Sequence, residues 1–422
     1  MRNKTSLLAI GIAVALGGIL LPGCLKDKVK KTYTVYTPVY TRKTTVIAAI
    51  NGDPAQTITK AGQIYIKDSY IYLNEFNSGI HVIDNSNPAH PVQTAFLNIP
   101  GNQNIGIRGN TLFADMYSDL LAIDISNVKQ VKVIDTLYNA IPYRSSGQSD
   151  YVITGWTKRD TTVDVETRPG PPIFYDVPGT SFYAMSASAS QAAAASLGSG
   201  SNGLAGSTAT MTLVGDYLYL IPEPHSLNTI NVSDPSKLAL SSNVYAGFDI
   251  ETIFSIRNRL LLGSKEGVYI FSLDDPSKPV KIGEFQHGRA CDPVIADQNY
   301  AYVTLRSGTT CGGSANELDV LNGKDLSQVS MLKSYPMTNP SGLGKDGSVL
   351  FICDGPDVKV FDASDPSNLK QLTTIPVAGA YDVIANNHVL LVASPTGLDQ
   401  YDYSDPSHIV ALSHLSVTKS QQ

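Results

Sequence analysis

Charged side chains and long apolar segments are both scarce in this chain of 422 residues. Only 16% of the residues are charged, and 31 basic residues against 37 acidic ones leave a net charge of −6. That balance lacks the basic excess that marks nucleic-acid-binding proteins, so we expect no nucleic-acid partner. The apolar stretch over residues 7–21 is shorter than the roughly 20 residues that a membrane-spanning helix needs. It suits the core of a secretory signal better.

Signatures of catalysis are also missing. The sequence contains no Gly-x-Ser-x-Gly, no His-Glu-x-x-His and no phosphate-binding glycine loop, and its seven histidines are scattered. His81 lies inside a predicted strand, which favours a packed side chain over a ligand. The Gly-rich segment 307–313 has no helix after it to present amides to a phosphate, so we interpret it as a loop. Because these motifs are missing, the sequence gives no reason to expect a cofactor.

The first of only four cysteines, Cys24, ends the sequence Leu-Pro-Gly-Cys directly after the apolar stretch. A short basic start followed by this arrangement resembles a bacterial lipoprotein signal, in which the cysteine is acylated after cleavage. Several acyl chains on one residue give stable membrane anchoring. We therefore expect a signal peptide over residues 1–23 and a lipidated N-terminus and tether over residues 24–43. The alternative is an ordinary cleaved signal with an incidental cysteine.

The residues after Cys24 bear on location. Leu25 stands where the inner-membrane retention signal of enterobacterial lipoproteins has Asp. Acidic residues typical of surface export are also lacking, and the next residues include four lysines: Lys26, Lys28, Lys30 and Lys31. Such a cluster favours anionic headgroups. We expect anchoring to the outer membrane of the cell envelope, on the periplasmic face.

The other three cysteines of an exported chain would meet oxidising conditions. Cys291 precedes a predicted hairpin and Cys311 follows it. We expect a disulfide between them that ties the base of the hairpin, and a free, buried Cys353. The alternative is a metal site made of His287, Cys291 and Cys311, which the spacing and the compartment favour less.

A short pattern recurs seven times along the chain, and it indicates the architecture. Each copy is a brief apolar strand that ends on Asp, Asn or Ser, usually before a Ser-Asp-Pro-like turn. The final polar residues are Asp84, Asp124, Asn231, Ser272, Asn322, Asp362 and Asp402, which stand 40, 107, 41, 50, 40 and 40 apart. A period near 40 with several strands per unit is typical of a β-propeller. The 22 tyrosines and 34 glycines also fit short strands and tight turns.

Two further strands precede each copy and a weaker one follows it. Around the first copy they are residues 63–66, 70–73 and 92–96. Four antiparallel strands in seven repeats predict an all-β fold, a seven-bladed β-propeller of four-stranded antiparallel blades over residues 44–416. Residues 417–422 are left as a tail.

Two segments fall outside the regular repeat. We interpret Thr44 to Ile50 as the strand that closes the last blade, a place for which Ile409 to Leu415 competes. The long interval implies an insertion at about 137–207. Its second half, 184–207, is almost entirely Ala, Ser and Gly. Such a segment buries too little side chain to offset the entropy of ordering, so we expect a mobile loop, with a short helix at 187–197 as the alternative.

The units resemble LVIVD repeats, which occur in secreted and lipid-anchored bacterial propellers, among them those of Bacteroidetes. The resemblance is carried by Gly79-Ile80-His81-Val82-Ile83-Asp84, by Cys291-Asp292-Pro293-Val294 and by Ala301-Tyr302-Val303-Thr304-Leu305-Arg306. It covers nearly everything from residue 32 to residue 414 except the insertion. It implies the propeller fold and an envelope location, and it implies no enzymatic activity.

Propeller geometry sorts the loops onto two faces. One face carries repeated Asx-type turns, which we interpret as structural. The other face carries varied polar residues around the mouth of the central channel, where convergent polar groups favour binding. The predicted binding residues are Glu75, Asp115, Glu251, Arg289, Asp292, Arg306, Asp354 and Asp382.

The sequence thus predicts a lipid-anchored, non-enzymatic binding or scaffold module with a protein or glycan partner. The alternative is a hydrolase or lyase that acts on a polysaccharide, with Asp249 and Glu251, or Asp292 and Asp382, as its acid–base pair. An enzyme of this kind needs a carboxylate buried beside a second one, with a raised pKa. A binding rim leaves its carboxylates solvated.

Overall fold

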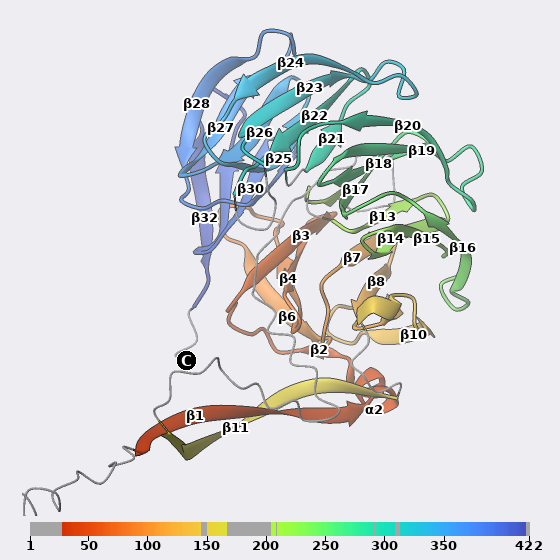
Figure 1. Cartoon of the computed structure of the whole chain (residues 1–422), viewed down its shortest axis with the longest axis vertical. Helices are drawn as coiled ribbons and strands as arrows, with labels where there is room; N and C mark the ends of the chain where they lie inside the picture. Colours follow the sequence, from red (N-terminus) through yellow and green to blue (C-terminus); the bar gives the residue numbers. More distant parts are fainter. Residues whose placement is uncertain are drawn as a thin grey trace, which may run out of the picture. The chain divides into compact units, whose positions relative to one another are not determined.

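The computed structural model describes residues 28–144, 150–166, 204–207, 209–290, 293–308 and 313–418. It divides into two compact units, one of residues 1–39 with 155–186 and one of residues 40–154 with 187–422. The larger unit is an all-β seven-bladed propeller, as predicted, and Figure 1 shows its blades following one another around a common centre. Within the described residues, no helix is long and apolar enough to cross a membrane.

The first four blades contain antiparallel strands in chain order. Blade 1 has β3 (Ala61–Lys67), β4 (Tyr70–Glu75), β5 (Gly79–Asp84) and β6 (Val92–Asn98), and blade 2 has β7 (Ile105–Arg108), β8 (Thr111–Met116), β9 (Asp119–Asp124) and β10 (Lys132–Leu137). Blade 3 has β13 (Met211–Val214), β14 (Tyr217–Glu223), β15 (Ser226–Asn231) and β16 (Ala239–Tyr245), and blade 4 has β17 (Ile250–Ile256), β18 (Arg259–Ser264), β19 (Gly267–Ser272) and β20 (Val280–Gln286).

The last three blades repeat this order. Blade 5 has β21 (Val294–Ala296), β22 (Tyr300–Leu305), β23 (Glu317–Asn322) and β24 (Ser330–Pro336). Blade 6 has β25 (Pro340–Asp346), β26 (Val349–Asp354), β27 (Asp357–Asp362) and β28 (Lys370–Pro376). Blade 7 has β29 (Asp382–Asn386), β30 (Val389–Ser394), β31 (Gly397–Asp402) and β32 (Val410–Ser416).

The core lies between neighbouring blades, because the inner strands of each blade are covered on both faces. One apolar cluster joins Phe254 and Val268 of blade 4, Tyr302 and Leu318 of blade 5, and Leu343 of blade 6. The strand β19 is buried along its whole length, whereas β20 at the outer edge alternates between exposed and half-buried positions. In this blade the three inner strands are therefore mostly buried, and only the outermost strand reaches solvent along its length.

The turns after the third strands are Asx turns, as the sequence predicted. The Asp84 carboxylate accepts the amide N–H of Ser86 at 2.9 Å, and Asp362 does the same with Ser364 at 2.9 Å. These hydrogen bonds favour the ionised form and lower the pKa of both carboxyls. The repeated polar residues on this face therefore fix backbone turns.

The predicted closing strand over Thr44 to Ile50 is wrong. Residues Lys43–Ala49 form the helix α2, and Val46 and Ile50, four residues apart, enter the core of blades 1 and 2. Burial on one helical face thus overrides the strand preference of the β-branched residues. The strand that completes blade 7 is β32, which occupies most of the competing segment. The four strands of every blade are therefore consecutive in the described chain. The short β2 (Gly52–Asp53) pairs with β6 at the outer edge of blade 1.

The smaller unit contains most of a two-stranded ribbon, which the sequence did not predict. Its strands are β1 (Lys28–Arg42) and β11 (Tyr151–Glu166). Within this unit the Thr34 hydroxyl donates to Asp160 at 2.7 Å, and the Lys158 ammonium lies 5.4 Å from the centre of the Tyr36 ring. The alternation of Thr, Tyr and Val in β1 favours a strand.

The end of the insertion occupies the centre of the ring. The strand β12 (Leu204–Ala205) pairs with β3, the innermost strand of blade 1. The Ser207 hydroxyl oxygen accepts the Leu343 amide of blade 6 at 3.0 Å, and the Ala209 carbonyl accepts the Ile253 amide of blade 4 at 2.9 Å. The predicted loop over 184–207 is thus wrong at its end, where residues 204–205 form a strand. Residues 184–203, and with them the alternative helix at 187–197, lie outside the described residues.

Candidate functional site

Three of the predicted rim carboxylates share a structural role. Glu75, Asp115 and Asp354 lie in the last two positions of the second strands of their blades, and all are buried. Each accepts backbone N–H groups from the loop that enters its own blade. The donors are Thr59 for Glu75 (3.2 Å), Gln103 and Asn104 for Asp115 (2.7 and 3.0 Å), and Thr338 and Asn339 for Asp354 (2.9 and 2.6 Å). These carboxylates therefore hold the channel-face loops in place.

A basic side chain also contacts each of these carboxylates. His81 Nε2 lies 2.7 Å from Glu75, Lys359 Nζ lies 2.5 Å from Asp354, and Arg144 is paired with Asp115. Burial raises the pKa of Glu75, but hydrogen bonds from His81 and Thr59 outweigh it and lower the pKa. The three carboxylates are thus engaged inside the protein.

Asp382 lies buried beneath the segment that fills the centre of the ring. The Ser207 amide donates to Asp382 Oδ1 at 3.3 Å, while Oδ2 has no hydrogen-bond partner in the described part of the chain. A Cβ atom at Gly206 would lie 2.1 Å from Oδ2, so only glycine fits there. Burial raises the pKa of Asp382 well above its ordinary value, and the Ser207 and Val383 amides oppose this.

Several predicted residues cannot be placed. Asp292, Cys24, Cys291 and Cys311 lie outside the described residues, and with them the predicted lipidation, the predicted disulfide and the alternative metal site. Cys353 is free and buried in β26, as expected, and burial raises the pKa of its thiol. No cluster of three His, Cys, Asp or Glu side chains suited to a metal occurs among the residues that the structure describes.

The remaining predicted residues lie together on blades 4 and 5. Arg289 Nη2 lies 2.9 Å from Asp249 Oδ2, and Lys265 Nζ lies 3.5 Å from Glu251 Oε1. Burial raises the pKa of Glu251, and Lys265 opposes the rise. Burial likewise lowers the pKa of Arg306, which the charge of Glu251 counteracts. The structure thus joins Glu251 and Arg306 electrostatically and pairs Arg289 with a residue of the alternative catalytic pair.

Exposed aromatic side chains, which were not among the predicted site residues, adjoin these charges. Tyr245 is 63% exposed and Phe248 is 57% exposed. Their ring centroids lie 5.9 Å apart in an edge contact. The ring centroid of His225 lies 5.6 Å from that of Phe248, also in an edge contact. Phe248 directly precedes Asp249 in the loop between blades 3 and 4. The feature of the sequence that could have pointed to Phe248 is the Gly-Phe-Asp sequence between two predicted blades.

We call this combined region the blade 3–5 surface. It comprises His225, Tyr245, Phe248, Asp249, Glu251, Lys265, Arg289 and Arg306. Its loop between blades 4 and 5 is held by backbone bonds from His287 to the Glu266 carbonyl and from Ala290 to the Lys265 carbonyl, both at 3.2 Å. The surface thus combines an exposed aromatic cluster with ionic groups on a fixed backbone.

The fold defines the class of protein: a seven-bladed β-propeller whose ring is closed without a shared strand. More particularly, residues 59–95 and 205–246 match the LVIVD repeat, so this is an LVIVD repeat-containing propeller. The matched segments cover most of blade 1 and nearly all of blade 3 with the strand that precedes it. No curated protein sequence matches the chain.

Solved structures share the fold at low sequence identity. A protein from Lactobacillus plantarum superposes with a TM-score of 0.54 and 9% identity, over 85% of this chain and 97% of that one. The computationally designed protein Ika8 gives a TM-score of 0.52 and 8% identity, over 88% and 93% of the two chains. PorZ, a surface component of the type-IX secretion system of Porphyromonas gingivalis, gives 0.47 and 13%, over 86% of this chain and 38% of PorZ. These likenesses concern the fold alone.

Proposed function

We propose that this propeller is a lipid-anchored binding module of the cell envelope that engages a protein partner through the blade 3–5 surface. The observation that carries the proposal is the exposed pair Tyr245 and Phe248 beside the ion pair of Asp249 and Arg289. Aromatic side chains and arginine are the residues that most often dominate protein–protein binding energy.

The contrast with the rest of the channel face supports this choice. Three of the carboxylates there, Glu75, Asp115 and Asp354, accept hydrogen bonds from the protein's own loops. The fourth, Asp382, is buried beneath Gly206 and Ser207. On the blade 3–5 surface, by comparison, the Arg289 side chain is 58% exposed although it is paired. Exposed ion pairs contribute little to folding, so this one is available for recognition.

The envelope location is supported by the sequence around Cys24. Acylation of that residue would anchor the protein to the outer membrane, and we propose the periplasmic face. Lys30 and Lys31 follow within a few residues and would favour an anionic membrane surface.

The test is crosslinking of the full chain in native membranes, followed by affinity capture. The variant combines Tyr245→Ala, Phe248→Ala and Arg289→Ala, and the matched control is Tyr143→Ala, an aromatic residue that is 76% exposed elsewhere. We expect one specific protein to be captured with the wild type and the control and lost with the triple variant, at unchanged melting temperature.

Two results would contradict the proposal. Capture that is equal in all three proteins would exclude the blade 3–5 surface as the binding site. The enzyme alternative rests on the raised pKa of Glu251, although Asp249 is engaged by Arg289. Release of sugar fragments from an envelope polysaccharide by the purified protein, abolished by Glu251→Gln, would favour that alternative.

A further inference from the structure

The side chains of the ribbon formed by β1 and β11 have little cover within the smaller unit. Figure 1 shows the two strands side by side. All residues over 30–37 and over 157–160 are exposed. Because a two-stranded ribbon is only marginally stable in water by itself, we expect a surface from outside this unit to cover part of it.

The two faces of the ribbon differ in composition. The hydroxyl oxygens of Thr32 and Thr162 lie 3.0 Å apart. The Thr34 hydroxyl donates to Asp160 at 2.7 Å, so these four side chains share one face. Successive side chains of a strand point to opposite faces. The other face, which we call the Tyr33 face, therefore carries Lys31, Tyr33, Val35, Arg159 and Val163.

The Tyr33 face combines exposed apolar side chains with positive charge. Tyr33 is 49% exposed, and the exposed fractions of Val35 and Val163 are 40% and 43%. Lys31 and Arg159 are exposed beside them. The only acidic residue of segments 30–37 and 157–163 is Asp160, which lies on the opposite face. Tyrosine, aliphatic and basic side chains together suit the boundary between lipid headgroups and acyl chains.

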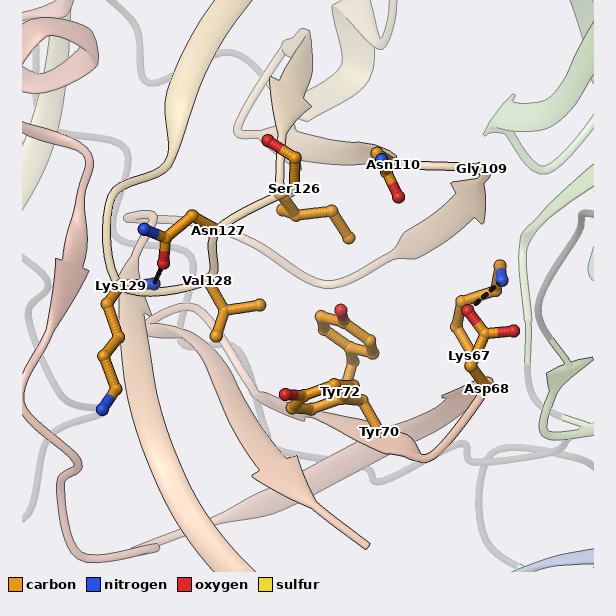
Figure 2. Close-up of a pocket in the computed structure, with 11 residues that line it drawn as sticks. Lys67, Asp68, Tyr70, Tyr72, Gly109, Asn110, Ser126, Asn127, Val128 and Lys129 are labelled. Carbon is orange, nitrogen blue, oxygen red and sulfur yellow. Dashed lines mark hydrogen bonds and ion pairs between the residues drawn. The ribbon is translucent and has the colours of Figure 1, made fainter. Parts of the chain in front are cut away.

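Tyrosines on the inner strands of the propeller are covered by the chain itself. Tyr70 and Tyr72 of β4 lie along the wall of the pocket in Figure 2 and pack in the apolar core of blades 1 and 2. Tyr72 is only 3% exposed. Tyr33 has no comparable cover, which again indicates a surface from outside its own unit.

The predicted lipid anchor identifies that surface as a membrane. The first residue of β1, Lys28, follows Cys24 by four residues, which span at most about 14 Å when fully extended. Acyl chains on Cys24 would therefore hold the start of β1 close to the bilayer. This step rests on the lipid anchoring that is part of the proposed function.

We propose that the Tyr33 face lies on the anionic surface of the membrane that holds the anchor. Tyr33, Val35 and Val163 would lie at the boundary between headgroups and acyl chains. Lys31 and Arg159 would face the lipid phosphates. The ribbon would thus lie along the bilayer as a second membrane contact beside the acyl chains.

The test uses the acylated protein, purified from membranes and reconstituted into vesicles of phosphatidylethanolamine and phosphatidylglycerol with brominated acyl chains. Bromine quenches tryptophan fluorescence on contact. Trp156 is the only tryptophan of the chain, so Trp156→Phe provides a background in which one new tryptophan reports one position. In this background, Tyr33→Trp places the reporter on the Tyr33 face, and we expect at least a twofold loss of its fluorescence.

Tyr36→Trp in the same background is the matched control. Tyr36 lies in the same strand and is 47% exposed. Its ring lies 5.4 Å from the Lys158 ammonium on the opposite face. We expect little quenching at this position, because the reporter would point away from the bilayer.

The charges of the face are tested with the Tyr33→Trp reporter. Removing a basic residue near an anionic surface weakens attachment about fivefold. Lys31→Ala combined with Arg159→Ala should therefore reduce the quenching, as should vesicles of phosphatidylcholine alone. Lys158→Ala removes a cation from the opposite face and should leave the quenching unchanged.

The anchor and the ribbon are measured separately, by flotation of the protein with the vesicles and by quenching. Protein that floats while Tyr33→Trp and Tyr36→Trp are quenched equally, or not at all, would overturn the ribbon proposal and leave the anchor intact. Protein that does not float would overturn both. A Tyr33→Trp reporter that is shielded from acrylamide but not quenched by lipid would also overturn the proposal, because the propeller or a second copy would then cover the face.

Discussion

Buried carboxylates in this propeller fall into two kinds, according to how many donors meet them. Asp115 accepts two backbone amides and two side-chain amides and is paired with Arg144, so its charge is fully compensated. Asp382 is met by the backbone amides of Ser207, at 3.3 Å, and of Val383, and its second oxygen has no hydrogen-bond partner in the described part of the chain. A buried charge that lacks hydrogen-bond donors is costly. The ionised Asp382 carboxylate therefore destabilises the fold, whereas the Asp115 carboxylate does not.

This difference predicts the effect of Asp382→Asn. Because burial raises the pKa of Asp382, the folded state binds a proton more tightly than the unfolded chain, and stability is lost as pH rises from about 4 through the raised pKa. Asparagine carries no charge and fits a similar space. We expect the variant to be more stable than the wild type at pH 7, with a gain that grows by up to about 1.4 kcal/mol per pH unit.

The measurement is urea unfolding of both proteins at several values between pH 4 and pH 8. A stability difference that stays constant over this range would contradict the prediction. Glu75→Gln serves as the control, because the pKa of Glu75 is lowered and the same replacement should destabilise the protein there.

At the scale of elements, the helix α2 is a part of the structure that the repeat pattern does not predict. Lys43 at its first position is buried, and its Nζ lies 2.6 Å from Asp119 Oδ2 of β9. Removal of one partner from a buried ion pair leaves an uncompensated charge. We therefore expect Lys43→Ala to lower the free energy of unfolding by about 3–5 kcal/mol.

The double variant Lys43→Met with Asp119→Asn separates charge from packing. It removes both charges, so it should recover much of the stability lost in Lys43→Ala. Chemical denaturation of the two variants and the wild type measures the difference. Equal losses in the single and double variants would show that α2 contributes through packing alone.

The repeats were predictable because each blade is local in sequence. Alternating apolar strands, Asx turns and a period near 40 are all read within one repeat, and the structure confirms them over seven blades. The segment at Lys43–Ala49 was mispredicted because Thr, Val and Ile there favour a strand, and only the core of blades 1 and 2 selects a helix. The pairing of β1 with β11 joins segments more than 100 residues apart, which no local pattern reveals.

The roles of the predicted site residues depend on contacts that sequence does not contain. Asp115 and Asp354, at the ends of second strands, accept backbone amides that sequence cannot assign to them. The path of Gly206 and Ser207 through the centre was also hidden, because it follows a low-complexity segment. The sequence shows a phenylalanine at position 248, but only the fold determines that its side chain is exposed.

At the scale of the whole molecule, the ring closes between blades 7 and 1 through side chains and loop backbone. Asn85 and Gln400 exchange two side-chain hydrogen bonds at 2.9 and 2.7 Å, and the Ser413 hydroxyl donates to the Pro88 carbonyl at 2.7 Å. An apolar cluster that includes Ile64 and Leu391 lies beneath them. Propellers must protect their edges, and no strand is shared across this junction.

This junction is therefore where the ring should open first. Gln400→Ala removes both hydrogen bonds and leaves the Asn85 amide unpaired, which should cost about 1–3 kcal/mol. Native-state hydrogen exchange should then show reduced protection in β3 and β29–β32, with the amides of blades 3 and 4 unchanged. The matched control is Thr304→Val, which removes a 2.7 Å hydrogen bond to the Ser341 carbonyl between blades 5 and 6. If blades 7 and 1 lose protection only together with all the others in both variants, the ring unfolds as one cooperative unit and the junction is no weaker than any other.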